Sequence, residues 1–336
     1  MRRIAMWATL LGVLALGACQ PQEEEKPRPT PYELPTPGHF PTQNNIPADN
    51  PMTEEGVALG EKLFFDSSLF TAHSSPSTCC ASCHHPKYSF EFGPEGTLEH
   101  LGTQHTMLPL VNLVWNTTGL GWRADVATLE DMVLAAYTDP AEIDADTAEV
   151  VRSLHRSDTY PALFKKAFGT EDIHFGLVQK AIAQYVRSLV FSDSKFDRYL
   201  RGEEQLDQDE LNGYLLFITE EGGDCFHCHG GGGNALFTTN LLYNNGLDAE
   251  YHGEFKAPTL RNIALTAPYM HDGRFRTLDE VIDFYSEGVQ YSEQISPLMH
   301  HVMQGGVRLT EPEKRQLKAF LHTLTDRSLA TQATPN

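Results

Sequence analysis

Two short stretches of this 336-residue chain place two cysteines three residues apart, with a histidine directly after the second cysteine. The first is Cys80-Ala81-Ser82-Cys83-His84, and the second is Cys225-Phe226-His227-Cys228-His229. This spacing is typical of covalent c-type haem attachment, in which both thiols add to the porphyrin vinyl groups and the imidazole binds the iron. The two motifs therefore predict two covalently bound haems c, with His84 and His229 as the proximal iron ligands.

A zinc site and a pair of disulfides are the alternative readings of these cysteines. A zinc ribbon usually brings its two cysteine pairs within about 20 residues of each other, whereas these pairs lie in opposite halves of the chain. Disulfides do not require a histidine after each pair. Cys79 stands just before the first motif and is expected to be an inert neighbour of the first haem.

The N-terminus has the features of a bacterial export signal. A cationic start at residues 2–3 precedes an apolar run, residues 4–16, that is too short to span a bilayer comfortably. The sequence Leu16-Gly17-Ala18-Cys19 resembles a lipobox, which predicts a lipoprotein signal peptide at residues 1–19 and a membrane anchor on lipidated Cys19. A plain cleaved signal peptide is the alternative. Both predict export, and a periplasmic location suits haem attachment completed outside the cytoplasm.

Residues 20–51 contain nine prolines and an acidic run at residues 23–25. A stretch of this composition is expected to bury no apolar surface and to form an extended linker. The rest of the chain is long enough for two domains with hydrophobic cores. We predict an N-terminal cytochrome c-like domain with the first haem at residues 52–192, and a C-terminal one with the second haem at residues 193–330.

The chain is strongly acidic, with a formal net charge of −20. This charge argues against nucleic acid as a partner and favours electrostatic attraction to a basic protein partner. Acidity also aids solubility, so the charge alone does not identify that partner.

Matching segments around the two haem motifs predict an internal duplication. A helical pattern ending in Leu-Phe precedes each motif, at residues 60–64 and 213–217. Behind each motif, Thr128 and Thr277 have acidic residues two positions later and are expected to cap helices. Strand signals are few. The predicted fold is therefore mainly α, with two cytochrome c-like haem domains related by internal duplication.

Apolar residues at helical spacing predict further helices along the chain. These helices are expected at residues 54–65, 148–154, 160–168, 175–191, 211–219 and 311–324. Thr310, with Glu313 three positions later, has the pattern of a capping box before the last helix. The polar stretch 192–208 is expected to cross between the two domains.

The duplication leads to a prediction about the sixth ligand of each iron. Tyr285 lies eight positions after Thr277, and Ala136 lies eight positions after Thr128. A phenolate oxygen can ligate iron but a methyl group cannot. We therefore expect His229 and Tyr285 on the second iron and an open position opposite His84 on the first. A core tyrosine on an amphipathic helix is the alternative for Tyr285.

The chain resembles the bacterial dihaem cytochrome c peroxidase and MauG superfamily over residues 46–326. The resembling segments include PADNP at 47–51, LFFD at 63–66, both haem motifs, and FKAPTLRN at 255–262 continuing as ALTAPYMHDGRF at 264–275. The resemblance implies a peroxide-dependent oxidoreductase, with the peroxidatic haem in the domain at residues 52–192 and the electron-transfer haem in the domain at residues 193–330. At the position of Tyr285, peroxidases of the well-known kind have methionine and MauG-type proteins have tyrosine.

The resemblance also implies roles for residues outside the motifs. Glu142 matches a distal glutamate over the peroxide-binding haem, where a base can move a proton between the two peroxide oxygens. Trp122 matches a tryptophan that relays charge between the haems. Thr266 and Pro268 match backbone-carbonyl ligands of an inter-haem calcium ion, a hard cation that oxygen ligands suit. For Glu142 and Trp122 the alternatives are a solvated turn residue and a large core aromatic.

Some positions depart from the family pattern. The distal glutamine of the family is Met132 here, which puts peroxidase efficiency in doubt. The asparagine that helps to bind calcium is Thr106 here, which weakens the calcium prediction. His100 and His105 lie where peroxidases of this type carry a histidine that blocks the active iron at rest. Either histidine could do so here, and unliganded loop histidines are the alternative.

Together these patterns predict an exported dihaem c-type peroxidase. It would reduce hydrogen peroxide to water with electrons from a small redox protein, such as a cytochrome c or a cupredoxin. The nearest enzymatic alternative is a MauG-like enzyme, in which peroxide brings both haems to a highly oxidised state that removes electrons from a protein side chain. A non-enzymatic alternative is a dihaem electron carrier with both irons six-coordinate.

Overall fold

The computed structural model describes residues 28–69, 79–94, 105–231, 233–249 and 253–330. The fold is mainly α, as predicted. The α-helices are α1 Glu54–Phe65, α2 Cys80–Cys83, α4 Leu129–Thr138, α5 Thr147–Arg156, α6 Tyr160–Phe168, α7 Phe175–Ser188, α8 Lys195–Leu200, α9 Gln208–Phe217, α10 Phe226–His229, α11 Leu278–Asp283 and α12 Glu311–Thr323. The shorter elements are the 3₁₀ turns Ser67–Leu69, Pro86–Tyr88, Leu113–Trp115, Ile263–Leu265 and Val302–Gln304, the π-turn Phe284–Gly288, and the antiparallel pair β1 Leu242–Tyr243 and β2 Phe255–Lys256.

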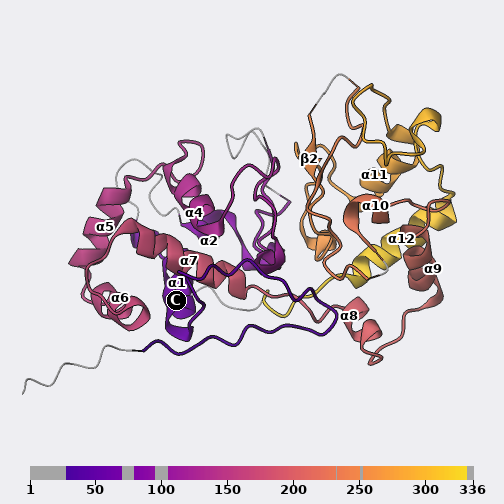
Figure 1. The fold of residues 1–336 in the computed structure, drawn as a ribbon. Coiled ribbons are helices and arrows are strands. Elements are labelled where there is room, and N and C mark those ends of the chain that lie inside the picture. The colour runs from indigo at the N-terminus through magenta and orange to yellow at the C-terminus, as the bar shows by residue number, and fades with distance from the viewer. Residues whose placement is uncertain (1–27, 70–78, 95–104, 232, 250–252, 331–336) are drawn as a thin grey trace, which may run out of the picture.

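The helices gather in two lobes, with α1, α2 and α4–α7 in one and α9–α12 in the other (Figure 1). In the first lobe, α1 packs against α7 so closely that a Cβ on Gly60 would lie 2.0 Å from the carbonyl oxygen of Ala181. In the second lobe, a Cβ on Gly213 of α9 would lie 1.9 Å from the carbonyl oxygen of Gln316 in α12. The Gly-x-x-Leu-Phe pattern before each haem motif therefore marks a helix contact that only glycine permits.

The helix starts predicted from Thr128, Thr277 and Thr310 are confirmed. The Thr128 hydroxyl accepts a hydrogen bond from the amide of Asp131, and Thr277 and Thr310 each form a capping box. Helix α7 ends at Ser188, three residues before the predicted end. The chain leaves the helix there because the amide of Phe191 donates to the side chain of Asn112 instead of continuing the helical ladder.

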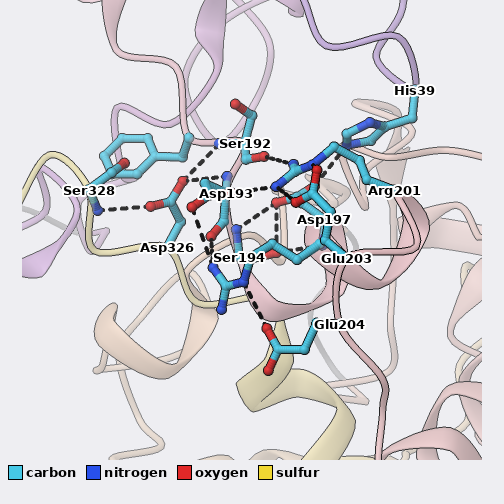
Figure 2. Close-up of polar contacts among 12 residues, drawn as sticks. His39, Ser192, Asp193, Ser194, Asp197, Arg201, Glu203, Glu204, Asp326 and Ser328 are labelled. Atoms are coloured by element: carbon cyan, nitrogen blue, oxygen red, sulfur yellow. Dashed lines mark hydrogen bonds and ion pairs between the residues drawn. The ribbon is translucent and has the colours of Figure 1, made fainter.

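Residues 192–208 connect the lobes and also contain Asp197, which forms a buried ion pair with the second lobe. Asp197 in α8 and Arg261 in the second lobe are 0% and 1% exposed and form two short hydrogen bonds, at 2.9 and 2.7 Å. Burial alone would raise the pKa of Asp197, but the hydrogen bonds and charge of Arg261 overcome this effect and lower it. Figure 2 shows that Asp326 also accepts hydrogen bonds from the amides of Ser192 and Asp193.

The described part of the proline-rich N-terminal stretch is docked, so the prediction that it buries no apolar surface is wrong there. Figure 1 shows this indigo segment running from the first lobe to α8 and back. His39 lies 2.8 Å from Asp197 (Figure 2). Phe40 is 5% exposed, packs edge-on against Trp115 and lies under the Arg261 guanidinium at 4.5 Å. Proline spacing could not reveal these contacts because they depend on partners more than 70 residues away.

Across the described ranges, no helix has the length and apolar character needed to cross a membrane. The predicted signal peptide, the predicted lipidation at Cys19 and residues 20–27 lie outside the described residues.

Removing Arg261 should strongly destabilise the protein. The substitution Arg261→Ala leaves the buried Asp197 carboxylate without its main partner, and breaking a buried ion pair from one side costs about 3–5 kcal/mol. The matched control is Arg152→Ala, because Arg152 pairs with Glu149 on the surface and should hardly change the unfolding midpoint. Urea unfolding of the haem-loaded protein measures both effects, and equal midpoints for the two variants would contradict the prediction.

Candidate functional site

The first haem motif forms a single helical turn, α2, followed by His84. The Nδ1 atom of His84 lies 2.7 Å from the carbonyl oxygen of Phe90. A carbonyl only accepts, so Nδ1 carries the proton and Nε2 is the nitrogen left to bind a metal. Burial lowers the pKa of His84, which favours the neutral imidazole that ligates iron.

The second motif has the same arrangement. His229, at the end of α10, directs Nδ1 to the carbonyl oxygen of Pro258 at 3.0 Å. Burial lowers the pKa of His229 to about 4, so this ring is also neutral near pH 7. In both motifs a backbone carbonyl thus accepts the Nδ1 proton and leaves Nε2 as the nitrogen that can bind iron.

None of the four motif cysteines forms a disulfide in the structure, so all four sulfurs are available for haem attachment. Burial raises the pKa of Cys80 and of Cys225 to about 12 in each case. Cys79 is also a free thiol; it is buried, with its sulfur 3.4 Å from the Ser82 hydroxyl oxygen. Its expected role as an inert neighbour of the first haem stays a prediction.

A large apolar cavity lies beside the second motif. Its empty space, together with the solvent at its mouth, is about 1430 Å³. Both motif cysteines and His229 line it, along with a mainly apolar set of side chains that includes Phe217, Leu260, Ile263, Leu278, Ile282, Val289, Leu317 and Leu321. Two free thiols, an oriented imidazole and an apolar cavity are the features that a covalently attached haem requires. The residues present therefore fit the group.

Tyr285 lines the same cavity as His229, as the duplication argument requires of a sixth ligand. It lies in the π-turn Phe284–Gly288, a form of helix that often marks functional sites. Its phenol oxygen accepts a 3.0 Å hydrogen bond from the side-chain amide of Asn245, and that amide also lies 3.8 Å from the sulfur of Met270. Asn245 could not be found from the sequence, because no motif or spacing connects it with Tyr285.

By count from the capping threonines, Ala136 in α4 corresponds to Tyr285, which lies in the π-turn after α11. Counted from the capping threonines, Leu129 and Leu278 are both buried, as are Val133 and Ile282. The position just before Ala136 and Tyr285 differs, because Phe284 is buried in the π-turn whereas Ala135 of α4 is exposed. Ala136 brings only a methyl group, which cannot bind a metal.

Glu142 lies in a turn after α4 and close to the first motif. Its negative charge raises the pKa values of Cys80 and Cys83, although burial raises both by more. The pKa of Glu142 is itself raised, first by burial against the surrounding protein and then by the charge of Asp139. Because part of Glu142 remains open to solvent, it can exchange protons with water.

Trp122 belongs to the first half of the sequence but lines the cavity of the second motif. Its indole nitrogen donates to the carbonyl oxygen of Thr106 at 2.7 Å. Its ring meets Phe255 and His271 edge-on, with centroids 6.2 and 6.4 Å away. The structure thus brings an aromatic side chain from one half against the haem cavity of the other.

His105 packs with this aromatic group, because its ring lies 5.4 Å from Phe255 and 5.6 Å from His271. His100 lies outside the described residues. Whether either histidine binds the first iron at rest stays a prediction. The calcium site at Thr266 and Pro268 also stays a prediction, and the Thr106 hydroxyl nearby donates to the carbonyl oxygen of Met270.

Comparison with known proteins identifies the family. Over 300 residues the chain is 30% identical to the methylamine utilization protein MauG of Methylophilus methylotrophus, covering 84% of this chain and 86% of that one. It is 32% identical to MauG of Methylorubrum extorquens, with 82% and 79% covered. This chain belongs to the di-haem cytochrome c peroxidase and MauG family. The family profile described as di-haem cytochrome c peroxidase matches residues 54–205.

Other members of the di-haem family lie at similar distances. The cytochrome c551 peroxidase of Nitrosomonas europaea is 30% identical, with 82% of this chain and 81% of that protein covered. Among solved structures, a MauG-like protein associated with microbial copper homeostasis superposes with a TM-score of 0.78 at 32% identity, over 90% of this chain and 98% of that one. The relatives of this chain are thus peroxidases and MauG proteins, and the family uses two haems c.

The pH dependence of stability tests the burial of Glu91 beside the first haem motif. Glu91 directly follows Phe90, whose carbonyl oxygen orients His84. Glu91 is 2% exposed, and burial raises its pKa from 4.5 to about 7. Between these pH values the folded state therefore binds more protons than the unfolded state does. The free energy of unfolding should fall as pH rises through this window. The fall should be about 3 kcal/mol for a shift of this size.

The substitution Glu91→Gln should remove this fall, and urea unfolding at pH 4.5 to 7.5 measures it. The control is Glu149→Gln. Hydrogen bonds from Arg156 and Arg152 lower the pKa of Glu149, so it stays ionised across this pH range and its replacement should retain the pH profile of the wild type. If the pH dependence of the unfolding free energy were unchanged in Glu91→Gln, its assignment to Glu91 would be wrong.

Proposed function

We propose that this chain is a peroxide-dependent dihaem oxidoreductase of the MauG type, which removes electrons from a side chain of a partner protein. The observation that carries the proposal is the phenol of Tyr285 on the wall of the cavity that holds His229. An anionic oxygen ligand lowers the reduction potential of iron and favours oxidised states, whereas a methionine ligand raises it. Two MauG relatives at 30% and 32% identity support the same choice.

The residues of the chain would divide the work between the two lobes. When bound, the haems would supply the iron that binds hydrogen peroxide and the oxidising power that peroxide delivers. Glu142 would take the proton from the peroxide oxygen nearer the iron and return it to the other oxygen, which leaves as water. Trp122 would relay charge between the lobes, and Asn245 would hold the Tyr285 oxygen in place.

The setting of this reaction is part of the proposal. The two lobes would be haem domains that arose by duplication, with a boundary near residue 192. The net charge of −20 would attract a basic patch on the partner protein. A lipid on Cys19 would hold the protein at a membrane on the periplasmic side.

Cytochrome c peroxidation is the second candidate function, favoured by the peroxidase relatives. In this case two electrons per peroxide would come from a small redox protein instead of a partner side chain. Steady-state assays with hydrogen peroxide and reduced cytochrome c distinguish the two. We expect peroxide to react rapidly while cytochrome c is oxidised slowly, and rapid cytochrome turnover would favour the second candidate.

Tyr285→Phe should remove the sixth ligand of the second iron. We expect the low-spin signal of that haem to be replaced by a high-spin signal in electron paramagnetic resonance and absorption spectra. Tyr243→Phe is the matched control, because Tyr243 lines the same cavity but bonds to Thr239 instead. Unchanged low-spin signals in Tyr285→Phe would show that the phenol is not a ligand.

Glu142→Gln should slow the reaction with hydrogen peroxide by about 100-fold or more, because a positioned general base contributes at least this much. Anaerobic stopped-flow absorption measures the rate at equal haem content. Glu149→Gln removes a carboxylate on α5 and should react at the wild-type rate. Equal rates in Glu142→Gln and Glu149→Gln would exclude Glu142 as the proton carrier.

A further inference from the structure

A group of imidazoles and carboxylates lies next to the second haem motif. Glu220 and Asp224 belong to the segment between α9 and α10, and His227 is in α10 between the two haem-binding cysteines. His300 comes from a distant segment, just before the turn Val302–Gln304. None of the roles assigned above uses these four side chains.

His227 is oriented as metal-binding histidines usually are. Its Nδ1 atom lies 2.6 Å from a carboxylate oxygen of Asp224, whose side chain is only 6% exposed. Its Nε2 atom lies 3.6 Å from a carboxylate oxygen of Glu220. A metal-bound histidine commonly donates its other nitrogen to a carboxylate in this way, which fixes the ring and makes the free nitrogen a better ligand.

His300 completes a three-ligand arrangement with Glu220 and His227. One ligand atom from each of the three lies within 4.8 Å of the others. Ligands at about 2.05 Å from a tetrahedral zinc ion are roughly 3.3 Å apart, so a bound ion needs only a small inward movement. Glu220 and His300 can make this movement because their side chains are 57% and 40% exposed.

The two segments that supply these ligands are tied together independently of any ion. His301 directs Nε2 to the backbone carbonyl of Glu220 at 2.9 Å, and its Nδ1 meets the side-chain amide of Gln304 at 2.9 Å. The Nδ1 atom of His300 lies 3.8 Å from the second carboxylate oxygen of Asp224. Asp224 thus lies between both histidines, and His301 holds the distant segment in place.

We propose that Glu220, His227 and His300 bind one divalent transition-metal ion, with Asp224 as the carboxylate behind His227. Two imidazoles and one carboxylate suit Zn²⁺ and Cu²⁺, whereas Ca²⁺ and Mg²⁺ prefer oxygen ligands alone. Three protein ligands leave a coordination position for water or for a group of another molecule. The site lies beside the second haem cavity, which Asp224 and His300 also line, and it does not depend on the proposed function.

Titration of the haem-loaded protein, prepared without an affinity tag and treated with a chelator, tests the site. Calorimetry with Zn²⁺ should show one equivalent bound to the wild type. Affinity should fall at least about tenfold in His300→Ala and in Glu220→Gln. The control His174→Ala removes an exposed histidine of the first lobe and should bind as the wild type does.

Electron paramagnetic resonance with Cu²⁺ identifies the ligands. The copper signal should show coupling to two imidazole nitrogens in the wild type and to one in His300→Ala. Haem content should stay unchanged in all variants, since none replaces a haem ligand. The haem absorption spectrum should stay unchanged in Glu220→Gln, whose side chain is not among those that line the haem cavity. No binding to the wild type, or equal affinity in the wild type, His300→Ala and Glu220→Gln, would overturn the proposal.

Discussion

Two backbone carbonyl groups determine which nitrogen of each motif histidine is free to bind a metal. In the first lobe the carbonyl of Phe90 lies six residues after His84, so the motif is held by its own loop. In the second lobe the carbonyl of Pro258 lies 29 residues after His229. The segment that carries Pro258 also carries Arg261, which is paired with Asp197 between the lobes. The orientation of the second histidine therefore depends on the contact that joins the two halves.

The two halves repeat an order of elements but provide different chemistry. Each has a glycine-mediated helix contact, a haem motif and a threonine-capped helix. At the eighth position of that helix one half has Ala136 and the other has Tyr285. Under the proposed function, this difference would leave the first site open to an outside molecule and let Tyr285 close the second. Asn245 and the π-turn support Tyr285 only in the second half.

The sequence predicted most of the helices, because helix caps and apolar spacing are local signals. Helices α1 and α6 have the predicted bounds, and the capping threonines begin helices as expected. The haem motifs were equally clear, since their chemistry is contained in five residues. Contacts between distant residues were not predictable in this way. The docking of Phe40, the Asp197–Arg261 pair and the donor role of Asn245 each depend on how remote segments meet in the folded chain.

The π-turn Phe284–Gly288 has a consequence for how variants of this family can arise. A π-turn accommodates one residue more than an α-helical turn of the same length. Each residue of an α-helix turns the next side chain by roughly 100° about the helix axis. Deleting one residue before position 285 would therefore rotate the phenol away from the cavity and place the side chain of an adjacent residue there. Insertions and deletions in this turn, and not only substitutions, can thus exchange the group that lines the cavity together with His229.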